Sequence, residues 1–173
     1  MQDKLGIVYT PVEIVDFINS SVAEVLKKEF GASVSDKGVH ILDPFTGTGT
    51  FITRMMQSGL IDKESLPYKY KNDLHANEIV PLAYYIASVN VESVYRDLMP
   101  ESEYEPNNVM IWTDTFKSRG RQEDVFKTEL KDNEARRAKE DGLDIKVIIG
   151  NPPYSVGQDS QNDDNQNERY EAL

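Results

Sequence analysis

The chain contains no cysteine among its 173 residues, so no disulfide and no thiolate metal site can form. Its only histidines, His40 and His75, do not have the spacing of metal ligands, and we expect no bound metal. No apolar run approaches the roughly 20 residues that cross a bilayer, so we expect no membrane contact. The absence of cysteine fits a reducing cytoplasm, which is the location we predict.

Basic residues are also scarce, with 19 Lys and Arg against 30 Asp and Glu and a net charge of −11. Proteins that bind duplex DNA usually carry a basic surface, because phosphate contacts supply much of the affinity. Either the chain does not bind nucleic acid, or the DNA-binding surface lies outside these residues. The apolar fraction of 39% is typical of a globular chain with its own core.

Strand and helix patterns alternate along the chain after an N-terminal helix. That helix is predicted over residues 10–30, with Thr10 as a cap, Pro11 in the first turn, Glu13 completing a capping box and Gly31 ending the run. Further helices are predicted over 51–57, 82–89 and 122–140, a polar connection over 60–71, and strands over 39–43, 74–79, 109–113 and 145–149. The alternation predicts an α/β fold with a mainly parallel sheet and flanking helices.

Four polar side chains are each predicted at the carboxyl end of a strand. They are Asp43, Glu78, Asp114 and Asn151. Ligands bind at the carboxyl edge of an open α/β sheet, where the ends of parallel strands meet. The pattern therefore predicts one site that contains all four residues.

The segment from Asp43 to Phe51 reads Asp-Pro-Phe-Thr-Gly-Thr-Gly-Thr-Phe. Gly47 and Gly49 permit tight turns and close approach of a ligand, and the following helix offers free N–H groups. The third glycine of the dinucleotide fingerprint is replaced by Ile52, and no lysine of a phosphate-binding loop follows. Glu78 is predicted to accept hydrogen bonds from ribose hydroxyls. The plain alternatives are a glycine-rich turn and a solvated glutamate.

The sequence Asn151-Pro152-Pro153-Tyr154 follows the last predicted strand. An amine attached to an aromatic ring is a poor nucleophile, because its lone pair is delocalised. The Asn151 side-chain oxygen and the Pro152 carbonyl can accept both amine hydrogens, and the prolines hold these acceptors in place. Tyr154 can stack on a base taken out of a duplex. The alternative is a proline-rich turn with a surface tyrosine.

In this order the motifs resemble the S-adenosylmethionine-dependent N6-adenine DNA methyltransferases whose target-recognition domain follows the catalytic motif. The resemblance covers residues 6–157, and the sequence from Gly150 onward is similar to long single-polypeptide restriction-modification enzymes. It implies a partial Rossmann-like methyltransferase fold and site-specific adenine methylation of DNA.

The resemblance also assigns a role to each motif. The cofactor-binding residues would be Tyr9, Thr10 and Pro11 at the methionine end, Asp43, Pro44, Phe45, Thr46, Gly47 and Gly49 around the pocket, and Glu78, Ile79, Asp114, Thr115 and Phe116 at the ribose and adenine. The catalytic residues would be Asn151, Pro152, Pro153 and Tyr154. From the residues alone, the Tyr-Thr-Pro segment is better interpreted as a plain helix cap, and Asp114 equally as a strand-end cap.

The sheet of that family has more strands than this sequence predicts. Residues 1–157 therefore read as the incomplete, cofactor-binding part of a methyltransferase domain, followed by a polar tail over 158–173 that we expect to be disordered. Duplex DNA would be contacted mainly by regions absent here. The isolated chain is expected to bind cofactor at most, to methylate DNA poorly, and to be open to self-association.

Other acceptors remain as alternatives. Protein-glutamine methyltransferases resemble the chain at Asn-Pro-Pro-Tyr, and some RNA methyltransferases share Asp-Pro-Phe with a glycine pair. Both usually lack the N-terminal Tyr-Thr-Pro helix, so Thr10 and Pro11 argue against them. Cytosine-N4 enzymes are similar too, but Asn151 favours adenine. A non-catalytic module that binds cofactor or acts as a scaffold is the alternative from another class.

Overall fold

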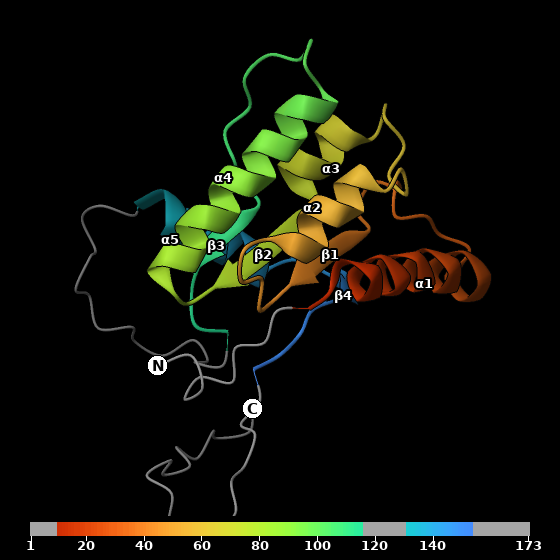
Figure 1. Cartoon of the computed structure of the whole chain (residues 1–173), viewed down its shortest axis with the longest axis horizontal. Coiled ribbons are helices and arrows are strands. Elements are labelled where there is room, and N and C mark those ends of the chain that lie inside the picture. The colour runs from red at the N-terminus through yellow and green to blue at the C-terminus, as the bar shows by residue number, and fades with distance from the viewer. Residues whose placement is uncertain (1–9, 116–130, 154–173) are drawn as a thin grey trace, which may run out of the picture.

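A parallel sheet of four strands, in the order β3-β2-β1-β4, forms the centre of the chain (Figure 1). This computed structural model describes residues 10–115 and 131–153. Its elements are α1 (Val12–Phe30), β1 (His40–Asp43), α2 (Thr50–Gln57), α3 (Leu66–Asn72), β2 (Leu74–Glu78), α4 (Pro81–Leu98), β3 (Met110–Trp112), α5 (Lys131–Asp141) and β4 (Ile145–Ile148). The predicted α/β fold is confirmed.

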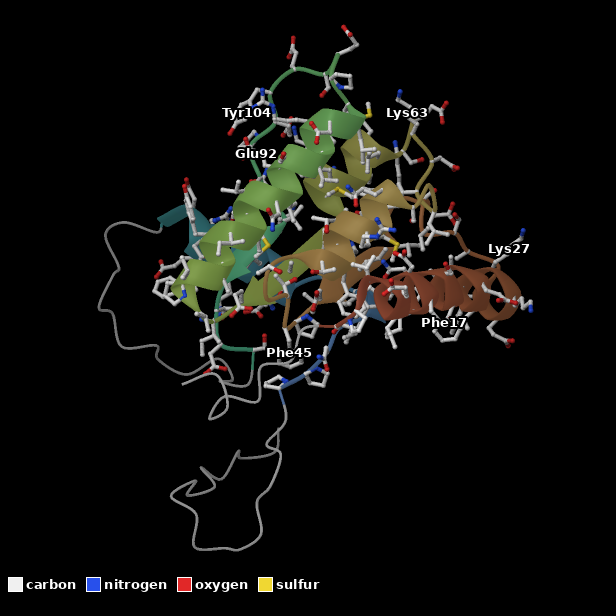
Figure 2. The ribbon with its side chains drawn as sticks, in the orientation of Figure 1. Phe17, Lys27, Phe45, Lys63, Glu92 and Tyr104 are labelled. Atoms are coloured by element: carbon white, nitrogen blue, oxygen red, sulfur yellow. The ribbon has the colours of Figure 1, made fainter. Side chains whose placement is uncertain are left out.

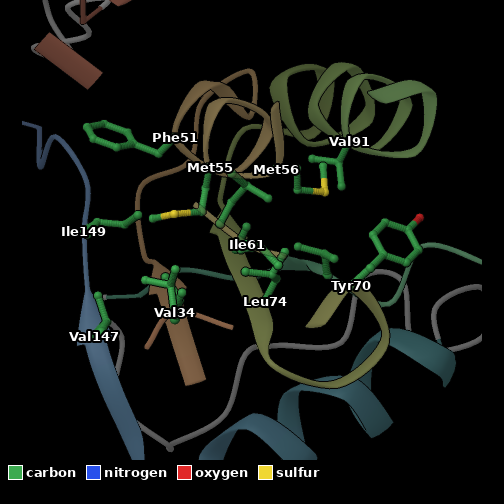
Figure 3. Packing of buried hydrophobic residues seen from close by; sticks show 14 of the residues in the cluster. Val34, Phe51, Met55, Met56, Ile61, Tyr70, Leu74, Val91, Val147 and Ile149 are labelled. Atoms are coloured by element: carbon green, nitrogen blue, oxygen red, sulfur yellow. The ribbon is translucent and has the colours of Figure 1, made fainter. Parts of the chain in front are cut away.

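Helices cover both faces of the sheet. The neighbouring helices α2 and α4 lie over one face, and α5 lies against the other (Figures 1 and 3). The chain runs outward from β1 to β2 and β3, then returns to place β4 on the opposite side of β1. The crevice beside such a reversal of strand order, at the carboxyl edge, is where α/β sheets bind ligands.

The core fills the space between the sheet and α2, α3 and α4 (Figure 3). Ile52 and Met55 of α2 are fully buried, and Leu74 of β2 is almost so. The rings of Tyr70 and Tyr95 stack with centroids 3.8 Å apart, so α3 and α4 are joined by an aromatic pair.

Helix α1 packs on α2 through an apolar stripe at helical spacing. Val15 and Leu26 are buried, and Ile18 and Val22 pack against the core. Two polar contacts add to this, since buried Asn19 donates to the Phe51 carbonyl at 3.1 Å and Arg54 pairs with Asp16 at 2.6 Å. The N-terminal helix is thereby fixed against α2.

The two ends of α1 differ in how well the sequence predicted them. Gly31 ends the helix with φ 60°, as expected for a left-handed cap. At the start, however, Pro11 is the N-cap and no side chain caps the helix, so the predicted capping box of Thr10 and Glu13 is wrong. The Pro11 carbonyl instead accepts from the N–H groups of Ile14 and Val15.

Two other helices differ from the sequence prediction. The predicted connection over 60–71 contains α3, whose inward face includes Lys69; its fully buried ammonium donates to the Val39 carbonyl at 2.6 Å and pairs with Asp73 at 3.1 Å. The helix predicted over 82–89 is longer in the structure, where α4 runs from Pro81 to Leu98, and Leu82 and Tyr85 near its start are 68% and 66% exposed. Predicted residues 122–130 of the charged helix lie outside the described residues.

The amino edge of the sheet carries a separate polar cluster. His40 Nδ1 lies 3.1 Å from His75 Nε2 and 3.5 Å from Asp73 Oδ1. Burial, and then the neighbouring His40, lower the pKa of His75 to about 4, so its ring is neutral at pH 7. Within 10–115 and 131–153, no three His, Asp or Glu side chains are grouped to bind a metal, and no helix is long and apolar enough to cross a membrane.

Candidate functional site

The carboxyl ends of the strands meet at one edge of the sheet, as the sequence predicts. Asp43 ends β1, Glu78 ends β2, Asp114 follows β3 and Asn151 follows β4. Backbone bonds continue beyond the strands, from Thr46 to Asn77, from Thr113 to Glu78 and from Ile149 to Leu42. The four predicted residues are therefore carried on neighbouring strand ends, with Phe45 at the same edge (Figure 2).

The two glycines of the loop after β1 have different surroundings. Both adopt left-handed backbone angles, with φ 56° at Gly47 and 90° at Gly49. A Cβ on Gly49 would lie 3.4 Å from Val91 and 3.5 Å from Ala87 of α4, whereas a Cβ on Gly47 would meet nothing within 4 Å. Gly49 thus lies against α4, whereas Gly47 faces open space.

Glu78 holds this loop from the neighbouring strand. Its Oε2 accepts from the Gly47 N–H at 2.8 Å, and its Oε1 accepts from the Val80 N–H at 2.7 Å. The carboxylate is buried, and each oxygen has a further lone pair for another donor. The sequence predicted a ligand contact for Glu78 and missed its part in fixing the glycine loop.

Asp43 is a fully buried carboxyl at the centre of the edge. Its Oδ1 accepts from the Phe45 N–H at 3.1 Å. Thr46 is close enough to lower the pKa of Asp43, yet Asp43 Oδ2 and Thr46 Oγ1 have no partner of ordinary hydrogen-bond geometry among the described residues. Burial chiefly, with the Glu78 charge adding to it, raises the pKa of Asp43 to about 6.

Asp43→Asn is expected to remove a pH dependence of stability between about pH 4 and 6. Because the folded pKa lies above the unfolded value of 3.8, the folded state holds the proton more tightly, and stability falls as pH rises through this window. The full difference is about 3 kcal/mol and is constant above the folded pKa. His75 has the opposite effect on the pH dependence of stability, because its lowered pKa makes stability rise as pH rises. This effect is the same in wild type and variant, so it cancels when the two are compared.

Urea unfolding of wild type and Asp43→Asn at a series of pH values measures this difference directly. The gap between the two unfolding free energies should change across the window and level off above it. Parallel curves would show that Asp43 does not bind a proton there.

Gly150 brings the strand of Asn151 against Asp43. A Cβ at Gly150 would lie 2.7 Å from Asp43 Oδ1, so a larger residue would fit only if the Asp43 carboxyl or the strand end shifted. Sequence reasoning missed this residue, although a glycine directly before Asn151 was the available signal. Asn151 is half-buried, and Pro152 and Pro153 are exposed beyond it.

The remaining predicted site residues differ in their contacts, and some lie outside the described residues. Thr115 Oγ1 donates to the Pro44 carbonyl at 2.7 Å, which ties the segment after β3 to the loop after β1. Ile79 is exposed, and its carbonyl accepts from Trp112 Nε1 at 2.9 Å. Thr10 and Pro11 lie at the start of α1 without a side-chain cap. Tyr9, Phe116 and Tyr154 lie outside the described residues.

Comparison with known proteins finds one protein family and several solved structures that are similar to the chain. A family model of N-6 DNA methylases matches residues 1–173. No curated protein matches the chain. Among solved structures, the ATP-dependent Type ISP restriction-modification enzyme LlaBIII bound to DNA is 45% identical with a TM-score of 0.78, and the match covers 90% of this chain.

Two further structures agree with this. A nuclease-deletion mutant of the Type ISP restriction-modification enzyme LlaGI, in complex with a DNA substrate mimic, is 45% identical over 95% of this chain with a TM-score of 0.79. A DrdV–DNA complex is 40% identical over 98%, with a TM-score of 0.83. The chain spans only 11%, 14% and 16% of the LlaBIII, LlaGI and DrdV chains.

Proposed function

Because this chain belongs to the N-6 DNA methylase family, we propose that it is the S-adenosylmethionine-binding part of a site-specific adenine DNA methyltransferase within a longer restriction-modification enzyme. The observation that carries the proposal is the carboxyl edge of the sheet. There Glu78 accepts a hydrogen bond from the glycine loop, and the loop begins beside Gly150, the residue that precedes Asn151. The match to restriction-modification enzymes solved with DNA supports the same function.

The residues of the edge fit the proposed cofactor. Gly47 leaves open space beside the loop. Asp43 Oδ2 and Thr46 Oγ1 have no well-formed partner among the described residues, so they are polar atoms that a polar ligand would satisfy. When bound, S-adenosylmethionine supplies an electrophilic methyl group. In this proposal Glu78 accepts from the ribose hydroxyls and Asp114 from the adenine amine, and Thr10 lies at the methionine end.

The target adenine would meet the other side of β1. The side-chain oxygen of Asn151 and the carbonyl of Pro152 accept the hydrogens of the target amine and keep its lone pair available for attack. Tyr154 stacks on the base after it leaves the duplex. Since the net charge of the chain is −11, the proposal gives the main phosphate contacts to other parts of the enzyme.

Calorimetric titration of this chain with S-adenosylmethionine tests the proposed site. Wild type should bind saturably. Glu78→Gln should weaken binding about tenfold, because the charged carboxylate that accepts from the ribose hydroxyls and from the Gly47 N–H becomes a neutral amide. Glu64→Gln removes the same charge from an exposed position between α2 and α3 and should bind like wild type. Absence of binding, or equal affinities for the Glu78 variant and wild type, would contradict the proposed site.

A further inference from the structure

Asn133 of α5 takes the place of a neighbouring strand along the outer side of β3. Its Oδ1 accepts from the Trp112 N–H at 2.8 Å, and its Nδ2 donates to the Trp112 carbonyl at 2.9 Å. A strand residue would make the same pair of bonds to the backbone of Trp112. The Asn133 side chain is buried, and β3 stands at one end of the described sheet.

Trp112 in turn holds the end of β2. Its indole Nε1 donates to the Ile79 carbonyl at 2.9 Å, and it lies opposite Glu78 in the register of the two strands. The next residue along, Thr113, donates its N–H to the Glu78 carbonyl at 3.0 Å. Asp114 follows directly. Asn133 therefore fixes Trp112. That residue lies opposite Glu78, hydrogen-bonds to Ile79 and comes two residues before Asp114.

Helix α5 reaches the sheet through polar contacts on a single face. Arg136 Nη1 donates to the Asn107 carbonyl at 2.9 Å, and Glu140 Oε1 accepts from Asn77 Nδ2 at 2.9 Å. With Asn133 these residues follow a helical spacing of three and four. On this face of α5 the Asn133 side chain is buried and those of Arg136 and Glu140 are half-buried. Together they bind β3, the segment before β3 and β2.

We propose that Asn133 is a positioning residue for the adenine end of the cofactor. It holds Trp112, and through Trp112 it sets the separation between Ile79 and Asp114, between which the adenine ring lies. This inference rests on the proposed function, because it assumes that Ile79 and Asp114 contact that ring. Asn133 itself touches no ligand in this arrangement.

The test compares two ligands that differ only at the base, S-adenosylhomocysteine and S-inosylhomocysteine, whose ring has oxygen in place of the amine. Asn133→Ala should weaken S-adenosylhomocysteine binding about fivefold to tenfold, the usual effect of losing one hydrogen bond, here the one that Asp114 accepts from the adenine amine. Binding of the inosine analogue should change less, so that the preference for adenine falls. Trp112 is the only tryptophan, and its fluorescence should become more accessible to acrylamide in the variant.

Glu134→Ala changes the exposed neighbour on α5 and should leave both affinities and the fluorescence unchanged. Asn133→Asp keeps the size and the acceptor but loses the donor, and carries the same test if the alanine variant does not fold. If the variant loses affinity for both ligands by the same factor, or loses none, Asn133 has no positioning role. Binding by the wild-type chain would still support the proposed function in that case. A wild-type chain that binds neither ligand overturns both.

Discussion

Gly47→Val is expected to abolish saturable binding of S-adenosylmethionine while the chain still folds. A Cβ at this position meets nothing within 4 Å, so the valine methyl groups project into the space beside the glycine loop. With φ at +56°, the side chain also strains the backbone by about 1–2 kcal/mol. The strain disturbs the Gly47 N–H that donates to Glu78. Calorimetry measures the binding, and circular dichroism during heating measures the stability.

Gly59→Val is the matched control for this change. Gly59 has φ +75° and likewise no atom within 4 Å of a Cβ, but it lies in the exposed turn after α2, away from the loop. The two variants should therefore lose similar stability, and only Gly47→Val should lose binding. Equal loss of binding in both variants would mean that Gly47 matters for folding alone.

Asn151→Ala is expected to lower methyl transfer to duplex DNA about 10²- to 10³-fold in the longer enzyme that contains this chain, with cofactor affinity little changed. The substitution removes an acceptor that acts on the target amine during attack. The glycine loop and Glu78 stand on the other strands and keep their contacts. Transfer of labelled methyl groups from S-adenosylmethionine to DNA measures the rate, and calorimetry measures the affinity.

Two further variants separate this role from a general effect of losing an amide. Asn72→Ala removes an asparagine whose side chain donates to the Tyr68 carbonyl within α3, away from the carboxyl edge of the sheet, and should methylate like wild type. Asn151→Asp keeps acceptor oxygens and should retain more activity than the alanine variant. Methylation that survives Asn151→Ala would show that another residue orients the amine.

The strands and their polar ends could be predicted because the signals are local. Each predicted strand agrees with the structure to within one residue at either end, since a short apolar run bounded by turn residues fixes its own limits. Parallel pairing then follows from the alternation of strands and helices. This is why Asp43, Glu78, Asp114 and Asn151 were correctly expected at one edge.

What the sequence did not predict depends on partners that are distant in the chain. Helix α3 was missed because Lys69 reads as a surface residue, and only its bonds to Val39 and Asp73 allow it to be buried. The same holds for Asn133, which binds the backbone of Trp112, and for Gly150, whose need for a small side chain comes from Asp43. No local pattern encodes such pairs.

The position of β1 between β2 and β4 has a consequence for how such enzymes diversify. In the proposed function, the loop after β1 and the end of β2 would hold the methyl donor, and the segment after β4, on the opposite side of β1, would face the acceptor. Mutations that remodel the β4 side can accumulate while the donor half stays intact. Selection can therefore exchange one nitrogen acceptor for another, and a designer can attempt the same by grafting the strand end that carries Asn151 together with Gly150, which it needs to fit against Asp43.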